Sequence, residues 1–335
     1  MRLAIVSVSD KGRQLALKIK ELLDDDSTII RADLFHKDVK RHLKVAFYEY
    51  DAIVAVMASG ILIRSIAPYI KSKATDPAVV NIDDNGNFVI STLSGHLGGA
   101  NRLAGKIADL IDATPVITTS SDVNNRLGID VLASDLYLTI DDAKEILHFN
   151  KAILDGRALT LTTSENKQYL LDYLERNTLE MDVCIKHSSD VGDDEIIASL
   201  DDHKIVLREK KFVVGIGCRR GKECSKIYEG LVKSMDDLKV GKSRITQFAS
   251  AEIKKDEKGI LELSDRLDVP VSFVDLDRLK LFESQDIQKS EFVKLKFGIY
   301  GVCEPSALIT AGFDSKLIYK KTSYDGVTIA IAVSK

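Results

Sequence analysis

Apolar positions along the first third of the chain occur in runs that predict strands and helices in turn. Residues 2–9, 28–35 and 51–58 are short segments rich in apolar side chains that predict strands, the first of them buried. Residues 11–23 instead carry apolar side chains at helical spacing. Strands that alternate with helices favour an α/β fold with mostly parallel sheets flanked by helices.

Two β-hairpins are predicted from turn signals between β-rich runs. Asp84-Asn85-Gly86 interrupts residues 78–92, and Asp325-Gly326 interrupts residues 317–333. Asn-Gly and Asp-Gly supply the left-handed backbone that tight hairpin turns require. A glycine-rich stretch, SGHLGGAN at 94–101, follows the first hairpin and leads into a helix over 100–111.

The rest of the chain divides into a less regular part and a second α/β part. Residues 131–210 hold short strands and helices without a glycine-rich loop, whereas residues 211–231 return to a buried strand, a tight turn and a helix. We therefore expect three domains, at 1–130, 131–210 and 211–335.

Composition and charge exclude several classes of protein. The chain has 335 residues, 45% of them hydrophobic, and a net charge of −4, which favours a globular protein without a nucleic-acid or anionic-membrane partner. The four cysteines form no CxxC pair, so a reducing compartment fits best. The N-terminal apolar run is too short for a signal peptide, and the longest apolar stretch is too short for a membrane helix. We expect a cytoplasmic protein.

Four turns stand at the ends of predicted strands, where α/β sheets hold their ligands. They cover residues 58–64, 91–101, 118–125 and 215–221, and they combine glycines with polar side chains. Three lead directly into helices, whose free N–H groups favour anions, so a substrate rich in carboxylates or phosphates is indicated. We expect the polar groups of the four turns to converge in one cleft and to contact this ligand. The alternative is that the glycines serve tight turns alone. None of the turns is a dinucleotide or P-loop fingerprint.

His96, inside the second of these turns, is the candidate for a general acid or base or for a ligand to a metal in the substrate, because an imidazole titrates near neutral pH. The alternative is a partly buried histidine that caps the following helix. The five other histidines, at 36, 42, 148, 187 and 203, are interpreted as solvated.

Arginines and a glutamate complete the candidates. Arg64, Arg219 and Arg220 could each grip a carboxylate, although one of them is expected to be ordinary surface charge. Glu304, before Pro305, could act as acid or base if partly desolvated, or could only complement the start of a helix. The full binding set is Ser59, Gly60, Arg64, Ser94, Gly95, Gly98, Gly99, Asn101, Asp122, Gly215, Gly217, Cys218, Arg219 and Arg220.

Two members of that set have strong competing interpretations. Asp122 follows a run of threonines and serines and fits a turn cap better than a ligand contact. Cys218 next to Arg219 could have a lowered thiol pKa, but a nucleophile would need a histidine that the neighbouring sequence does not offer.

These motifs together resemble the CbiG family of the oxygen-independent route to cobalamin. The resemblance rests on residues 56–70, 78–111, 114–122, 213–221 and 301–312. SGHLGGAN followed by GIGCRRG, in separate predicted domains, is its most specific combination.

The resemblance implies a hydrolase that opens the ring-A acetate δ-lactone of cobalt-precorrin-5A and releases acetaldehyde, which gives cobalt-precorrin-5B. It implies a tetrapyrrole substrate that is fringed with acetates and propionates and brings its own cobalt. No separate cofactor and no protein metal site are expected, and a homo-oligomer is left open.

Residue chemistry then suggests roles for this reaction. His96 is the expected base, the N–H groups of Gly98 and Gly99 are candidate oxyanion donors, and Glu304 is the alternative base. A non-catalytic corrinoid carrier would use the same glycines and arginines. An α/β enzyme with a phosphate ligand stays open, and a methyltransferase is weaker because no acidic residue is suitably placed for S-adenosylmethionine.

Overall fold

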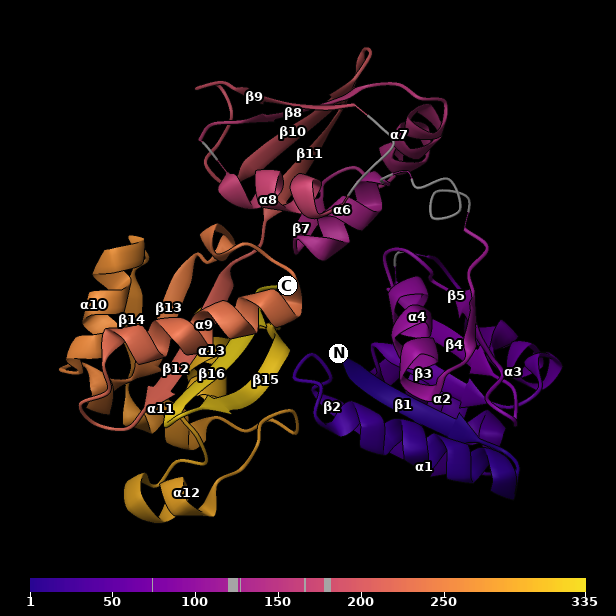
Figure 1. Cartoon of the computed structure of the whole chain (residues 1–335), viewed down its shortest axis with the longest axis horizontal. Coiled ribbons are helices and arrows are strands. Elements are labelled where there is room, and N and C mark those ends of the chain that lie inside the picture. Colours follow the sequence, from indigo (N-terminus) through magenta and orange to yellow (C-terminus); the bar gives the residue numbers. More distant parts are fainter. Residues whose placement is uncertain (74, 120–125, 127, 166, 178–181) are drawn as a thin grey trace. The chain divides into compact units, whose positions relative to one another are not determined.

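The computed structural model describes residues 1–73, 75–119, 126, 128–165, 167–177 and 182–335, which form three β-sheets with flanking helices (Figure 1). The α/β, multi-domain fold class predicted from the sequence is confirmed. By its internal contacts the chain divides into two compact units. Unit 1 comprises residues 1–134 and 144–157, and unit 2 comprises residues 135–143 and 158–335. The three-domain boundaries stay a prediction.

The first sheet has the strand order β2-β1-β3-β4-β5-β6. Strands β1 to β4 run parallel to one another, β5 runs antiparallel to β4, and β6 is parallel to β5. Its strands are β1 (Arg2–Ser7), β2 (Arg31–His36), β3 (Ala52–Val56), β4 (Ala78–Ile82), β5 (Phe88–Leu93) and β6 (Thr114–Val116). The helices around it are α1 (Asp10–Asp24), α2 (Val39–Glu49), α3 (Ser59–Ile66), the 3-10 turn η1 (Ala67–Tyr69) and α4 (Ala100–Ile111).

Both faces of this sheet are buried, which explains the continuous apolar runs of the sequence. Successive side chains in a strand point to opposite faces. Accordingly Val54 packs in one core with residues of α1 and α4, and Ile53 packs in a second core with residues of α2 and α3. Two helices therefore cover each face.

The middle sheet has the order β7-β11-β10-β8-β9, and among its described pairs only β8 and β9 are parallel. Its strands are β7 (Leu138–Ile140), β8 (Leu159–Thr163), β9 (Val183–His187), β10 (Glu195–Leu200) and β11 (His203–Glu209). The helices in this part of the chain are α6 (Ile129–Asp135), α7 (Glu145–Leu154) and α8 (Gln168–Arg176).

The third sheet has the order β14-β13-β12-β16-β15, with β12, β13 and β14 parallel and β15 and β16 forming the predicted hairpin. Its strands are β12 (Phe212–Cys218), β13 (Gln247–Ala251), β14 (Val271–Val274), β15 (Lys316–Tyr324) and β16 (Val327–Val333). The helices are α9 (Cys224–Leu238), η2 (Lys242–Arg244), η3 (Glu252–Lys254), α10 (Lys258–Leu267), α11 (Leu276–Leu281), α12 (Glu291–Phe297) and α13 (Cys303–Ala311).

Arg244 joins the middle sheet to the third sheet inside unit 2. Its side chain is 1% exposed and donates to the carbonyl oxygens of Leu136, Tyr137 and Lys210 at 2.8–3.0 Å. The guanidinium also lies over the rings of Tyr169 and Phe212. A buried cation held in this way fixes the two chain segments that connect the sheets.

Among the helices that the structure describes, none has the length and apolar character needed to span a lipid bilayer.

Candidate functional site

The glycine-rich turn at 94–99 and the turn at Ser59-Gly60 lie beyond opposite ends of the strands of the first sheet, so the expectation of one shared cleft is wrong for these two turns. The hairpin between β4 and β5 reverses the chain, so that Leu93 pairs with Val79 near the start of β4. Ser59 instead follows β3, at the edge where β4 ends. The loop after β6 leaves at the same edge as residues 94–99 because β5 and β6 are parallel.

The turn at 94–99 is held by its own hydrogen bonds. The Gly99 N–H donates to the His96 carbonyl oxygen at 2.8 Å, and the Asn101 N–H donates to the Gly95 carbonyl at 3.1 Å. Ser94 and Gly99 both have left-handed backbone, with φ of 55° and 83°. Because the Gly99 N–H is engaged inside the turn, it does not fit the predicted oxyanion donor, and Gly98 is left as the candidate.

Gly95 and Gly98 are required for the turn to close on itself. A Cβ on Gly95 would lie 2.7 Å from Oδ1 of Asn101, and one on Gly98 would lie 2.5 Å from Cβ of Ser94. At Gly98 the backbone of Ser94 is also within 2.7 Å and cannot move aside, whereas at Gly95 the amide of Asn101 would have to shift, so Gly98 has the stronger structural reason to be glycine. Their part in substrate binding stays a prediction.

Asn101 ties this turn to the loop that follows β6. Its Nδ2 donates to Oγ1 of Thr119 at 3.0 Å, and its side chain is buried. Asp122, a few residues further on, lies outside the described residues.

His96 lies beside a buried carboxylate that the sequence analysis missed. Its side chain is 14% exposed, and Nδ1 is 3.8 Å from Oδ2 of Asp130, which is 1% exposed. Oδ1 of Asp130 accepts from Nδ2 of Asn150 at 2.8 Å, and Lys73 Nζ stands 4.0 Å from Oδ2. Residues 73, 96, 130 and 150 come from separate segments of unit 1.

The Asp130 carboxylate is charged at neutral pH. Burial alone would raise its pKa, but His96 beside it, the hydrogen bond from Asn150 and the Lys73 ammonium hold the pKa below its usual value. In the sequence, the one signal that could have pointed to Asp130 was an acidic residue among the apolar residues of α6.

Ser59, Gly60 and Arg64 lie together at the other edge of the sheet. Oγ of Ser59 donates to Oδ1 of Asn81, whose Nδ2 donates to two backbone carbonyls of the β3 region. The Arg64 guanidinium lies beside Gly60, since a Cβ there would be 3.2 Å from Nη1. α3 also starts without a side-chain cap, which suits the predicted anion contact without testing it.

His36 is also at this edge and is not the solvated histidine that we expected. Its Nδ1 lies 3.1 Å from Oγ of Ser7, and its Nε2 lies 3.3 Å from Oδ1 of Asp10. The side chain is only 17% exposed. The end of β1 and the start of α1 therefore hold it on both sides.

Gly215 and Gly217 are buried under α13 and β16. A Cβ on Gly215 would lie 1.9 Å from the carbonyl oxygen of Cys303, and one on Gly217 would lie 2.5 Å from Oγ1 of Thr328. Close packing of α13 and β16 on β12 thus accounts for the missing side chains. Because both glycines are buried, they offer no exposed surface for the predicted contact with substrate.

The two arginines in the turn after β12, Arg219 and Arg220, are exposed. Arg219 is exposed, and its backbone N–H donates to the carbonyl of Gly326. Arg220 pairs with Asp256 at 2.7 Å, which makes it the arginine that resembles ordinary surface charge. Burial raises the pKa of the Cys218 thiol, and nearby lysines offset this only in part, so a reactive thiolate is disfavoured.

Glu304 is 1% exposed, and both of its carboxylate oxygens are occupied. Oε2 accepts from the Gln288 N–H at 2.8 Å, and Oε1 accepts from the Lys321 N–H at 3.0 Å. Burial raises its pKa in spite of these bonds. This geometry favours the anchoring of two segments over the catalytic base that the sequence suggested.

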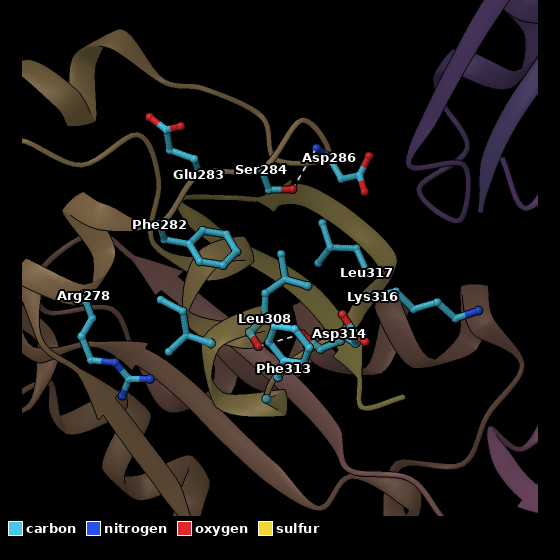
Figure 2. Close-up of a pocket in the computed structure, with 13 residues that line it drawn as sticks. Arg278, Phe282, Glu283, Ser284, Asp286, Leu308, Phe313, Asp314, Lys316 and Leu317 are labelled. Atoms are coloured by element: carbon cyan, nitrogen blue, oxygen red, sulfur yellow. Dashed lines mark hydrogen bonds between the residues drawn. The ribbon is translucent and has the colours of Figure 1, made fainter. Parts of the chain in front are cut away.

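A cavity of about 470 Å³ lies elsewhere in unit 2, and the described candidates do not line it (Figure 2). Lys316 lines the cavity and pairs with Val333, which in turn pairs with Phe212 at the start of β12. The cavity therefore lies near the start of β12, whereas Cys218 is at the end of that strand. Figure 2 shows Phe282, Leu308 and Phe313 around it, with Arg278 and Lys316 on opposite sides. Its acidic and basic side chains are mixed, so the cavity favours no ligand by charge.

Comparison with known proteins gives a consistent result over both α/β parts. The family model for the cobalamin synthesis G N-terminal domain matches residues 41–122, and the one for the cobalamin synthesis G C-terminus matches residues 212–332.

Individual relatives extend the match over the whole chain. A protein of Methanocaldococcus jannaschii named "Probable cobalt-precorrin-5A hydrolase" is 34% identical, with 99% of each chain covered. The cobalt-precorrin-5A hydrolase of Priestia megaterium is 29% identical over 98% of this chain and 94% of its own. The crystal structure of a cobalamin biosynthesis protein G homologue from Sulfolobus solfataricus aligns with a TM-score of 0.64 and 27% identity, covering 99% of this chain and 97% of that one.

Proposed function

Because the chain belongs to the CbiG family of cobalamin synthesis proteins, we propose that it is a cobalt-precorrin-5A hydrolase. The observation that carries this proposal is the 34% identity, over 99% of both chains, to the Methanocaldococcus jannaschii protein named "Probable cobalt-precorrin-5A hydrolase". The Salmonella typhimurium protein named "Cobalt-precorrin-5A hydrolase" is 30% identical over 86% of this chain. Both glycine-rich motifs lie inside the matched residues.

The proposed reaction has two steps that each need proton transfer. Water adds to the carbonyl of the ring-A δ-lactone, and the ring C–O bond breaks to leave a carboxylate and a free hydroxyl. That hydroxyl then loses its proton, its carbon–carbon bond to the macrocycle breaks in retro-aldol fashion, and acetaldehyde leaves while the electron pair passes into the macrocycle. A single base near the lactone can serve both steps.

His96 is the base that we propose. Its imidazole lies in the glycine-rich turn, and the charged carboxylate of Asp130 stands beside it. The Gly98 N–H is the proposed oxyanion donor in the same turn. Glu304 fits the role of the base less well, because both of its carboxylate oxygens accept hydrogen bonds from backbone N–H groups.

The substrate explains why exposed arginines accompany these turns. A tetrapyrrole fringed with acetates and propionates carries many negative charges, and guanidinium groups bind carboxylates in a bidentate manner. Arg220 is already paired with Asp256, and Arg64 lies beyond the opposite end of the sheet's strands from His96, so Arg219 is the arginine that stays a candidate for these carboxylates. The cobalt is proposed to arrive with the substrate. We place the protein in the cytoplasm, where its four free thiols stay reduced.

Acetaldehyde release tests the proposal directly. The purified chain is mixed with cobalt-precorrin-5A, and acetaldehyde is measured with alcohol dehydrogenase and NADH while mass spectrometry follows the corrinoid. We expect stoichiometric release from wild type and a loss of about 100- to 10,000-fold in His96→Ala, the usual effect of removing a general base. Binding of the corrinoid without acetaldehyde would instead identify a carrier. A His96→Ala variant as fast as wild type would remove His96 as the base.

A further inference from the structure

We propose that Asp130 is the positioning residue of His96, a buried carboxylate that orients the imidazole and stabilises its protonated form. The proposal rests on the proposed function only where it concerns catalysis, because the pairing of the two side chains can be tested without substrate.

Asp130 is itself rigidly held. Asn150 donates from Nδ2 to Oδ1 of Asp130 at 2.8 Å and accepts the Ile129 N–H on its own Oδ1 at 2.9 Å. Asn150 thereby bridges the side chain of Asp130 and the backbone of the residue before it. One carboxylate oxygen is thus fixed by α7, and the other is directed to His96.

The distance of 3.8 Å from Nδ1 to Oδ2 is that of an ion pair and exceeds a direct hydrogen bond. Catalytic contacts are often long before substrate binds and shorten in the complex. A carboxylate on the Nδ1 side favours the tautomer that has its proton on Nδ1. In that tautomer Nε2 carries the lone pair that accepts a proton from water or from the substrate hydroxyl.

Protonation of His96 would place a cation next to a buried anion. Burial alone would raise the pKa of Asp130, yet the neighbouring His96 and the hydrogen bond from Asn150 keep it low, so the negative charge is present when His96 takes up a proton. Among the residues that the structure describes, the other charged group beside the carboxylate is Lys73, whose side chain is 62% exposed and 4.0 Å away. Solvent screens that lysine, so His96 is the better protected partner of Asp130.

The test uses Asp130→Asn, which keeps the size of the side chain and an acceptor for Asn150 but removes the charge. The first measurement follows the His96 ring proton by NMR across pH, with the signal assigned from its loss in His96→Ala. We expect the midpoint of that titration to move down by about one pH unit, the size of effect that a neighbouring opposite charge exerts. Asp109→Asn, an exposed change of equal charge on α4, should leave the midpoint in place.

The second measurement is the pH profile of acetaldehyde release. We expect kcat of Asp130→Asn to fall by about 10- to 100-fold, a part of what a general base contributes, with KM little changed. The acidic limb of the profile should move to lower pH together with the NMR midpoint. A merely structural role would lower the amount of folded enzyme and leave the limb in place.

The outcomes separate the two proposals. An unchanged His96 midpoint in Asp130→Asn overturns the pairing, whatever the activity of the wild type. A shifted midpoint supports the pairing even if wild type releases no acetaldehyde, a result that would count against the proposed function alone. If Asp130→Asn does not fold, the wild-type His96 signal decides: a second inflection at acid pH, from Asp130, supports the pairing, and a single inflection overturns it.

Discussion

Gly215 lies directly against the backbone of Cys303, so closely that an added Cβ would stand 1.9 Å from the Cys303 carbonyl oxygen. The first turn of α13 therefore rests on the centre of β12 without any side chain between them. Backbone atoms on both sides cannot move aside as a flexible side chain can.

Gly215→Ala is expected to lower the free energy of unfolding by about 3 kcal/mol or more, the upper range for overpacking a core. Urea denaturation followed by circular dichroism measures it. Gly105→Ala is the matched control, because Gly105 lies in α4 with no atom within 4 Å of an added Cβ. That control should stabilise the chain by about 0.5–1 kcal/mol, since alanine favours helix. Equal effects in both variants would contradict the packing argument.

Arg244→Met is expected to destabilise the chain by about 2–4 kcal/mol, because three backbone carbonyls lose their donor in a buried place. Urea denaturation again gives the value. Lys242→Met, an exposed change in the same 3-10 turn, should stay within about 0.5 kcal/mol of wild type. A small effect of Arg244→Met would mean that the middle and third sheets are joined mainly by other contacts.

Glu304→Gln is expected to change stability in a pH-dependent way. Burial raises the pKa of Glu304 above its usual 4.5. Such a group contributes stability below about pH 4.5, and that contribution is lost as the pH rises through the pKa of the folded state. The glutamine side chain of this variant would lack an acceptor for one backbone N–H but would carry no charge, so the deficit against wild type should shrink between pH 4.5 and neutral.

The measurement for Glu304 is a series of urea titrations across that pH range. Glu291→Gln, an exposed change at the start of α12, is the control and should show a difference from wild type that does not vary with pH. A deficit of Glu304→Gln that grows towards neutral pH would show that its hydrogen bonds outweigh the burial of its charge.

Cys218→Ser is expected to retain acetaldehyde release within about twofold of wild type, because a thiol whose pKa is raised by burial is a poor nucleophile. Iodoacetamide should modify Cys218 more slowly than Cys184, which is exposed. Mass spectrometry of the alkylated peptides gives both rates. Loss of activity in Cys218→Ser, with faster modification of Cys218, would restore the nucleophile hypothesis.

The hairpin at Asp84-Asn85-Gly86 shows how far local sequence signals reach. The turn was predicted from these residues, and the antiparallel pairing of β4 and β5 with φ of 73° at Gly86 confirms it. The same reversal places residues 94–99 at the opposite sheet edge from Ser59. For these two turns the expectation of one cleft was wrong because it counted strand ends without following strand direction.

Asp130 shows what local signals could not give. Its neighbours Ile129, Leu132 and Ala133 are buried core residues, so the pattern predicts a helix but assigns the acid no partner. His96, Lys73 and Asn150 lie 20 to 57 residues away along the chain and reach Asp130 only through packing.

Taken by itself, the sequence determined the α/β fold class, both hairpins and the position of each glycine-rich turn, because these depend on side-chain periodicity and on backbone preferences within a few residues. The tertiary structure alone decided which sheet edge each turn occupies, which carboxylate stands beside His96, and that Gly215 serves helix packing. Those outcomes depend on strand direction and on contacts between distant segments, and nothing within a short stretch of chain encodes them.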